Sequence, residues 1–139
     1  MKANLFFVLV LLFISSFTII DSPCRKIRII PFQGKNGKVD RFKLMPIVKQ
    51  RFQKLGFQVI DKDSSLTSLD NCQILECRMV HTENYWEYKK DTVTLIIKDS
   101  SGRSIAQYQG VVGPVVMTFK SGFTDATVAA LNLVNPKDF

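Results

Sequence analysis

Residues 25–60, whose pattern indicates the first three elements of the chain, read RKIRIIPFQGKNGKVDRFKLMPIVKQRFQKLGFQVI. Its first residues alternate between basic and apolar side chains, so we predict a strand over 25–32 that places Ile27 and Ile29 on one face. The segment 33–38, which is rich in glycine, lysine and asparagine, has the composition of a turn. The chain is therefore expected to leave the first strand through a turn and to enter a second element at once.

That second element is predicted to be an amphipathic helix over residues 40–55. Its apolar side chains recur three, four and three residues apart and form one stripe: Met45, Val48, Phe52 and Leu55. Pro46 either begins the regular part of this helix or kinks it. Gly56 supplies the left-handed residue at which helices commonly end, and a short strand over 57–60 follows. A strand, a helix and a second strand in this order predict a right-handed parallel crossover.

Downstream of this unit we expect three more strands and a final helix. The predicted elements are strands over 72–82, 92–98 and 103–109 and a helix over 122–134. Residues 99–102 (DSSG) have the composition of a hairpin turn, whereas residues 110–120 are predicted to be irregular. The resulting order, β-α-β-β-β-β-α, predicts an α+β fold: a two-layer sandwich in which a mixed sheet of four to five strands carries both helices on one face.

The amino-terminal segment has the layout of an export signal. One lysine precedes an unbroken apolar run from Leu5 to Ile14, and a small polar stretch follows. We predict a signal peptide over residues 1–18 and one α+β domain over 19–139, which would make the protein secreted, periplasmic or envelope-associated. The alternative is an uncleaved inner-membrane anchor, because Ala3–Ile20 provides 18 uncharged residues, just enough to span a bilayer.

The three cysteines allow at most one disulfide. Cys72 and Cys77 would face opposite sides of a regular strand, so they are not expected to pair with each other. Cys24 is able to bridge either of them in an oxidising compartment.

No metal site, cofactor or catalytic residue is predicted. Cys77 and His81 share a strand face with Glu83, but residues four apart on a strand are separated by about 13 Å, too far for one zinc ion. We expect Cys77 and Met79 in the core and His81 near the strand end. No nucleotide-binding or hydrolase motif occurs, and a single histidine removes most acid–base arrangements. A small enzyme that uses carboxylates remains the alternative to a binding role.

The net charge of +7 belongs to one part of the chain. Residues 25–54 contain ten Lys and Arg and one Asp, whereas residues 55–139 are slightly acidic. The candidate residues for binding an anionic partner are Arg25, Lys26, Arg28, Lys38, Lys43 and Lys49. Such a partner would be an envelope protein or an anionic surface, while the alternative is a solvated face that aids solubility. Nucleic acid is disfavoured, because no reading helix or stacking motif is visible.

A second candidate contact is an aromatic cluster between two predicted strands. Tyr85, Trp86 and Tyr88 stand among polar residues in the segment 84–90 (NYWEYKK). Exposed Tyr and Trp are favoured anchors for a binding partner. The alternative is that these rings pack along the edge of the sheet.

Three segments of the chain resemble small domains of the bacterial cell envelope. They are Leu55–Val59 (LGFQV), Asp70–Glu76 (DNCQILE) and Leu95–Arg103 (LIIKDSSGR). The sequence is similar here to the amino-terminal domain of the Tol–Pal periplasmic protein, to the lipoproteins that activate peptidoglycan synthases and to related lipoproteins. Unlike those lipoproteins, this chain places Pro23 directly before Cys24, which disfavours lipid attachment. The resemblance implies a non-catalytic exported binding or adaptor domain, and it transfers no functional residue.

Overall fold

The computed structural model describes residues 24–33, 37–40, 42–61, 72–84, 90–113 and 119–139. The predicted signal peptide over residues 1–18 lies outside these ranges. Within them, no helix is both long enough and apolar enough to cross a membrane.

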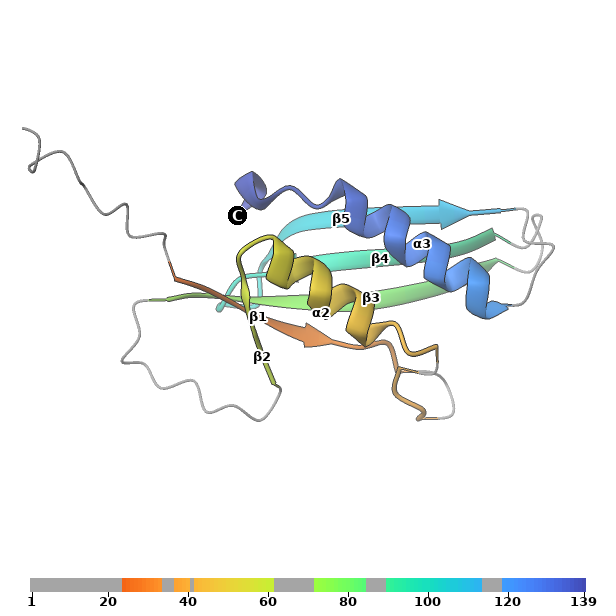
Figure 1. The fold of residues 1–139 in the computed structure, drawn as a ribbon, viewed down its shortest axis with the longest axis horizontal. Coiled ribbons are helices and arrows are strands. Elements are labelled where there is room, and N and C mark those ends of the chain that lie inside the picture. The colour runs from red at the N-terminus through yellow and green to blue at the C-terminus, as the bar shows by residue number, and fades with distance from the viewer. Residues whose placement is uncertain (1–23, 34–36, 41, 62–71, 85–89, 114–118) are drawn as a thin grey trace, which may run out of the picture.

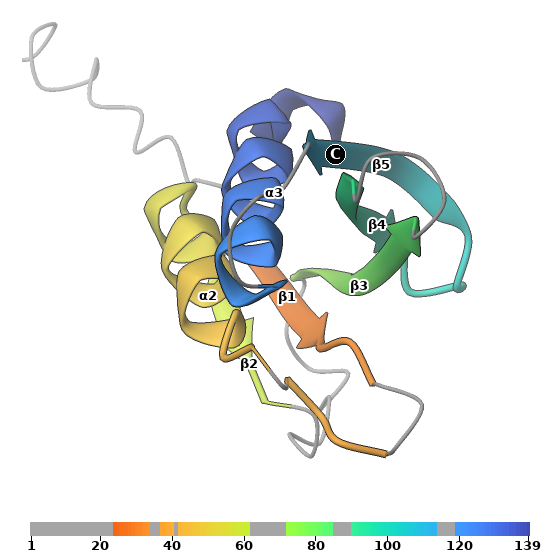
Figure 2. The same ribbon diagram turned by 90° about the vertical axis from the view of Figure 1, so that its right-hand side faces the viewer.

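The elements are β1 Arg25–Ile30, α2 Met45–Lys54, β2 Gln58–Ile60, β3 Gln73–Asn84, β4 Lys90–Lys98, β5 Ser104–Val112, α3 Phe119–Leu133 and the short 3₁₀ helix η1 Pro136–Asp138. The strands form one sheet in the order β2-β1-β3-β4-β5 (Figure 1). β1 runs parallel to both of its neighbours, and β3, β4 and β5 follow one another as an antiparallel meander. Both helices lie on the same face of the sheet (Figure 2). The predicted α+β two-layer fold and its element order are confirmed.

The helix α2 begins later than the sequence pattern predicts, at Met45 rather than at residue 40. Asp40 has a positive φ of 49° and its carboxylate accepts a 2.7 Å hydrogen bond from the backbone N–H of Leu44. It also accepts from the N–H of Met45, so it satisfies donors that the start of the helix leaves free. Pro46 lies in the first turn, which means that it begins the helix and does not kink it. Gly56 has a φ of +86° just past the last turn, as predicted.

The fifth strand extends beyond the end that the sequence pattern predicts. The pattern predicts an irregular segment from Gly110 onward, but this residue lies inside β5, which continues to Val112. A Cβ atom at Gly110 would collide with the backbone carbonyl oxygen of Ala126 and the backbone nitrogen of Ala130. Gly110 is therefore the point where the backbone of α3 rests on the sheet, and it does not end the strand.

The core lies between the sheet and the two helices. Its fully buried large side chains include Ile27, Val48, Phe52, Leu75, Leu95, Ile97 and Phe123. Cys77 and Met79 are buried among them, as predicted, and burial raises the pKa of the Cys77 thiol far above its usual value. The His81 ring stacks between Phe32 and Phe123, with ring centroids 4.2 and 4.9 Å away.

Cys24 and Cys72 form a disulfide, and Cys77 is a free thiol. The expectation of at most one disulfide is confirmed. The parallel pairing of β1 with β3 brings the two cysteines together, because Arg25 is the register partner of Gln73 and the Gln73 N–H donates to the Cys24 carbonyl oxygen. The bridge therefore joins the starts of two neighbouring strands.

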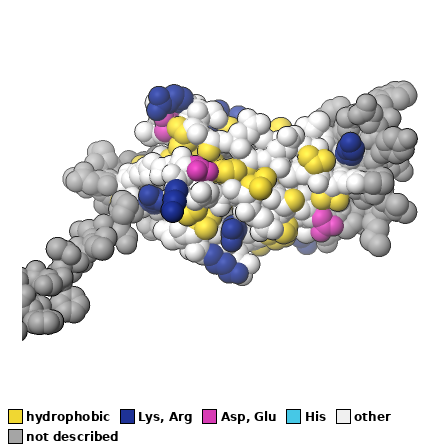
Figure 3. All heavy atoms as spheres, turned by 90° about the horizontal axis from the view of Figure 1, so that it is seen from above, with side chains coloured by type: hydrophobic (Ala, Val, Ile, Leu, Met, Phe, Trp, Pro, Cys, Tyr) yellow, Lys and Arg dark blue, Asp and Glu magenta, His cyan; other side chains and the backbone are white. Residues whose placement is uncertain are grey.

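Viewed from above, on the side of β5 and α3, the molecule presents a band of hydrophobic side chains (Figure 3). Lys and Arg side chains lie beside this band as well as at the margins of the view. Val111 on β5 and Leu133 on α3 are among the exposed large hydrophobic residues of the described chain, at 51% and 58% exposure.

Candidate functional site

The helix-free face of the sheet carries charged side chains in adjacent strands. Ile27 and Ile29 of β1 are buried towards the helices, so the alternating Lys26 and Arg28 belong to the opposite face. Arg28 is the register partner of Glu76 in β3, and Glu76 is in turn the partner of Lys98 in β4. Glu76 therefore has a cationic residue opposite it on each of the two neighbouring strands.

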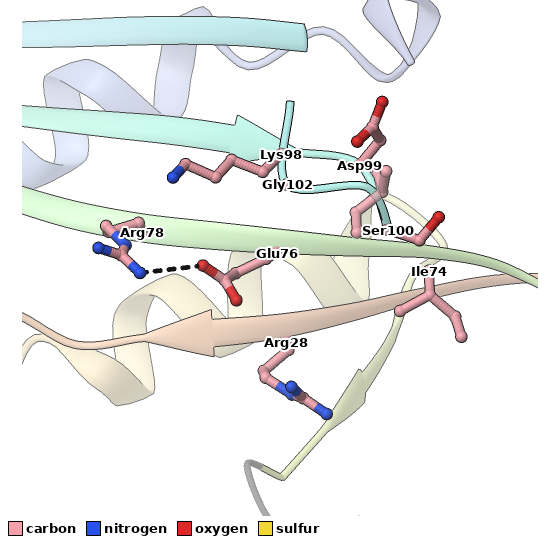
Figure 4. A pocket seen from close by; sticks show the side chains of 9 residues that line it. Arg28, Ile74, Glu76, Arg78, Lys98, Asp99, Ser100 and Gly102 are labelled. Atoms are coloured by element: carbon pink, nitrogen blue, oxygen red, sulfur yellow. Dashed lines mark hydrogen bonds and ion pairs between the residues drawn. The ribbon is translucent and has the colours of Figure 1, made fainter. Parts of the chain in front are cut away.

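A cleft of about 310 Å³ opens on this face (Figure 4). Its lining comes from β1, β3, the end of β4 and the β4–β5 hairpin: Arg28, Ile74, Leu75, Glu76, Arg78, Lys98, Asp99, Ser100 and Gly102. The cleft thus contains three cationic side chains, with Ile74 as an apolar contribution. We refer to it as the open-face cleft.

The ion pair between Arg78 and Glu76 in the open-face cleft is long and partly exposed to solvent. Arg78 Nη2 lies 3.5 Å from Glu76 Oε1, and both side chains are partly exposed to solvent (Figure 4). Pairs of this kind contribute about 0–1 kcal/mol. Among the residues that the structure describes, Arg28 Nε is buried without a hydrogen-bond acceptor. The cleft therefore holds cationic groups whose hydrogen-bonding capacity Glu76 does not use up.

The rim of the cleft is a rigid hairpin turn centred on Asp99. The Asp99 carboxylate accepts hydrogen bonds from the backbone N–H and hydroxyl of Ser101 and from the backbone N–H and Nε of Arg103. The Ser101 hydroxyl is the main cause of a lowered Asp99 pKa, and Arg103 adds to it. Gly102 takes the positive φ of 82° that the turn requires. The hydrogen bonds and the ion pair of Asp99 are thus made with Ser101 and Arg103 of the turn and not with Arg28, Arg78 or Lys98.

The predicted basic residues do not gather on one face. Lys26 and Arg28 lie on the helix-free face, whereas α2, which carries Lys49, covers the other. Lys49 pairs with Asp61 at 3.4 Å, and Lys38 and Lys43 are exposed in the connection before α2. The charge concentration over residues 25–54 is therefore divided between the two sides of the sheet.

Arg25 has a structural role in addition to its charge. Its Nη1 donates a 3.1 Å hydrogen bond to the Pro136 carbonyl oxygen, and its guanidinium carbon lies 5.9 Å from the centre of the Phe57 ring. It connects the first strand to the carboxyl-terminal segment. The aromatic candidates Tyr85, Trp86 and Tyr88 lie outside the described residues.

Three charged residues that the strands contribute to the open-face cleft are not among the candidates that the sequence pattern provides: Glu76, Arg78 and Lys98. Each stands at an alternating position of a predicted strand, which is the only signal available in the sequence. Their proximity to Arg28 depends on the lateral order of the strands, which the alternation does not reveal.

The chain matches no protein-family model and no curated protein. A search of solved structures finds a dodecamer of a PelC variant from Paraburkholderia phytofirmans. The match has a TM-score of 0.46 and 12% sequence identity, and it covers 78% of this chain and 84% of that chain. The fold assignment accordingly rests on the strand order and register described above.

Proposed function

We propose that this chain is an exported, non-catalytic binding or adaptor domain of the bacterial cell envelope that holds an anionic partner in the open-face cleft. The observation that carries the proposal is that Arg28, Arg78 and Lys98 line one cleft, where Glu76 is the register partner of Arg28 and of Lys98. The partner is an envelope protein or an anionic surface that presents carboxylate or phosphate groups.

The chemistry of the cleft favours an anion on a larger partner. Guanidinium groups bind carboxylates and phosphates through two parallel hydrogen bonds, and Arg28 and Arg78 both offer such a group. Among the described residues of the cleft, the ion pair that an arriving anion has to displace is the weak Arg78–Glu76 pair. Because the cleft lies on a face without helices, a polymer or a protein surface is able to approach it along the sheet.

The remaining cations of residues 25–54 support the proposal in a different way. Lys38 and Lys43 are exposed and lie apart from the cleft in the connection before α2. Charges in such positions attract an anionic partner over a distance of about 8–10 Å at physiological salt without contacting it. They would raise the rate of encounter, whereas the cleft would determine where the partner binds.

Export is supported by two features of the chain. The Cys24–Cys72 disulfide is of the kind that persists in oxidising compartments such as the periplasm. The amino-terminal sequence has the layout of a signal peptide. The assignment to the bacterial envelope in particular rests on the sequence resemblance to the Tol–Pal and synthase-activator domains.

The test compares two triple variants that remove the same charge. The variant R28Q/R78Q/K98Q empties the cleft of cations, while K38Q/K43Q/K54Q removes three exposed cations elsewhere. Retention on heparin and on phosphatidylglycerol vesicles is measured at several salt concentrations. We expect the cleft variant to weaken binding at least tenfold on one of the two probes and the control variant to weaken it less than threefold. Equal losses in the two variants, or no retention of the wild-type protein at low salt, would refute the proposal.

A further inference from the structure

The outer edge of β5 has the character of a pairing surface. β5 is the last strand in the sheet order, and the described part of the chain places no strand beyond it. Its nine residues, SIAQYQGVV, include neither proline nor a charged residue. Edge strands of soluble proteins are usually short or protected by charge, proline or bulges, and the other edge strand, β2, has only three residues. At β5 such protection is limited to an irregularity in the register near Ser104.

Residues 105–111 of β5 are symmetric about Tyr108 in the type of side chain. Moving outward from Tyr108, Gln107 matches Gln109, the small Ala106 matches Gly110, and the β-branched Ile105 matches Val111. A two-fold antiparallel pairing is self-complementary, so each residue must suit the residue at the mirrored position of the other copy. Around Tyr108, side chains of matched size and polarity would face one another, which meets this condition for a second copy of the same chain.

We propose that two copies of this chain pair through β5 in an antiparallel arrangement, with Tyr108 opposite Tyr108 of the second copy. In this register Gln107 lies opposite Gln109 of the second copy, and Ile105 lies opposite Val111 of the second copy. The absence of charge along β5 means that no like charges meet at the two-fold axis. The two sheets then form one continuous sheet, and the outward backbone groups of both edges are paired.

The face opposite the helices suits this pairing. Gln109 and Gln107 are the register partners of Thr94 and Ile96, so both glutamines belong to the helix-free face, where they are exposed. Side-chain amides at opposite positions of an antiparallel pair are able to hydrogen-bond across it. Val111, which is half-exposed in the single chain, gains an apolar neighbour in Ile105 of the second copy.

The helix layer carries an exposed apolar residue on the same side. Ala126 and Ala130 lie against Gly110, and Leu133 follows them at helical spacings of seven and three residues. Leu133 therefore lies on the β5 side of α3, where it is 58% exposed. The two-fold pairing brings the α3 helices of the two copies next to each other, and Leu133 is then shielded from water.

The test places opposite or like charges at Gln107 and Gln109, which face solvent and lie outside the core. In the proposed register, Q107E/Q109K puts Glu against Lys twice across the axis. Q107K/Q109K puts Lys against Lys at the same two places. The mass of the protein purified from cells that express the full chain is measured by sedimentation over a range of concentrations. We expect a dimer for the wild type and for Q107E/Q109K, and a dimer at least tenfold weaker for Q107K/Q109K.

Circular dichroism of each variant checks that the fold is unchanged. Any other antiparallel register puts residue 107 or 109 opposite a different residue, so that the two double variants no longer differ in the predicted direction. A monomeric wild type overturns the proposal, and so does equal dimerisation of the two variants. Gln107 and Gln109 do not line the open-face cleft. Retention on heparin, compared per chain, therefore tests the proposed function separately. A wild-type protein that dimerises but is not retained on heparin would refute the proposed function and support the dimer.

Discussion

The hydroxyl of Tyr108 donates a 2.6 Å hydrogen bond to Oδ2 of Asp138. This bond joins the centre of β5 to η1, and Phe139 next to it makes edge contacts with the rings of Phe57 and Tyr108. Burial of the phenol and its bond to Asp138 together raise the pKa of Tyr108 to about 12. The carboxyl-terminal residues are therefore a part of the packed domain.

The variant Tyr108→Phe is expected to lower the free energy of unfolding by about 1 kcal/mol, because it removes one hydrogen bond and keeps the ring. In the wild type the tyrosine pKa is higher in the folded state than the value of about 10 in the unfolded state. Its contribution is thus complete below pH 10 and is lost as the pH rises towards 12. Urea unfolding of both proteins on either side of pH 10 checks this. If the free energy of unfolding of the Tyr108→Phe variant falls with rising pH as steeply as that of the wild type, ionisation of Tyr108 is not the cause of the fall.

The variant Gly110→Ala is expected to lower the free energy of unfolding by about 2–3 kcal/mol, because its methyl group meets the backbone of α3. Backbone atoms yield less easily than the end of a flexible side chain, so α3 has to shift as a unit. The control is Gln53→Ala at an exposed position of α2, which should change stability by less than about 1 kcal/mol. Thermal unfolding followed by circular dichroism compares the two. Equal stability of the two variants would contradict the close contact of α3 with β5.

Removal of the disulfide by the double variant C24S/C72S is expected to lower the free energy of unfolding by about 4 kcal/mol, because the bridge closes a loop with a sequence separation of 48 residues. Thiol titration of the denatured, unreduced wild-type protein should find one free thiol per chain, that of Cys77. Three titratable thiols would exclude the bridge. A control variant, Cys77→Ala, retains the bridge and should leave no titratable thiol.

The variant Glu76→Gln is expected to bind heparin or phosphatidylglycerol vesicles about three to ten times more tightly at low salt. It removes the carboxylate that stands between Arg28 and Lys98 and frees Arg78 from its ion pair. Asp125→Asn on the exposed side of α3 changes the net charge by the same amount and serves as the control. A gain of equal size in both variants would mean that net charge acts without the cleft.

The β-α-β unit and the β4–β5 hairpin are predictable from sequence because their signals are local. The apolar stripe of α2, Gly56 after its last turn and the DSSG hairpin turn all act within a few residues. The role of Gly110 is not predictable in this way, because the group that excludes a side chain there belongs to α3. The same distinction explains why the sequence identifies Arg28 as a candidate and not Lys98: the two share a cleft only through the lateral order of three strands.

The disulfide also has a consequence for proteolysis. Because Cys24 and Cys72 are covalently joined, β1, α2 and β2 lie within a closed ring of the chain. A protease that cuts once inside this ring produces two chains that remain attached to each other, and the strand pairs of β1 with β2 and β3 hold their places in the sheet. On a denaturing gel, such a nicked protein would migrate as one species without a reducing agent and as two fragments with a reducing agent. The sheet is thus protected against the loss of its first two strands by a single cleavage.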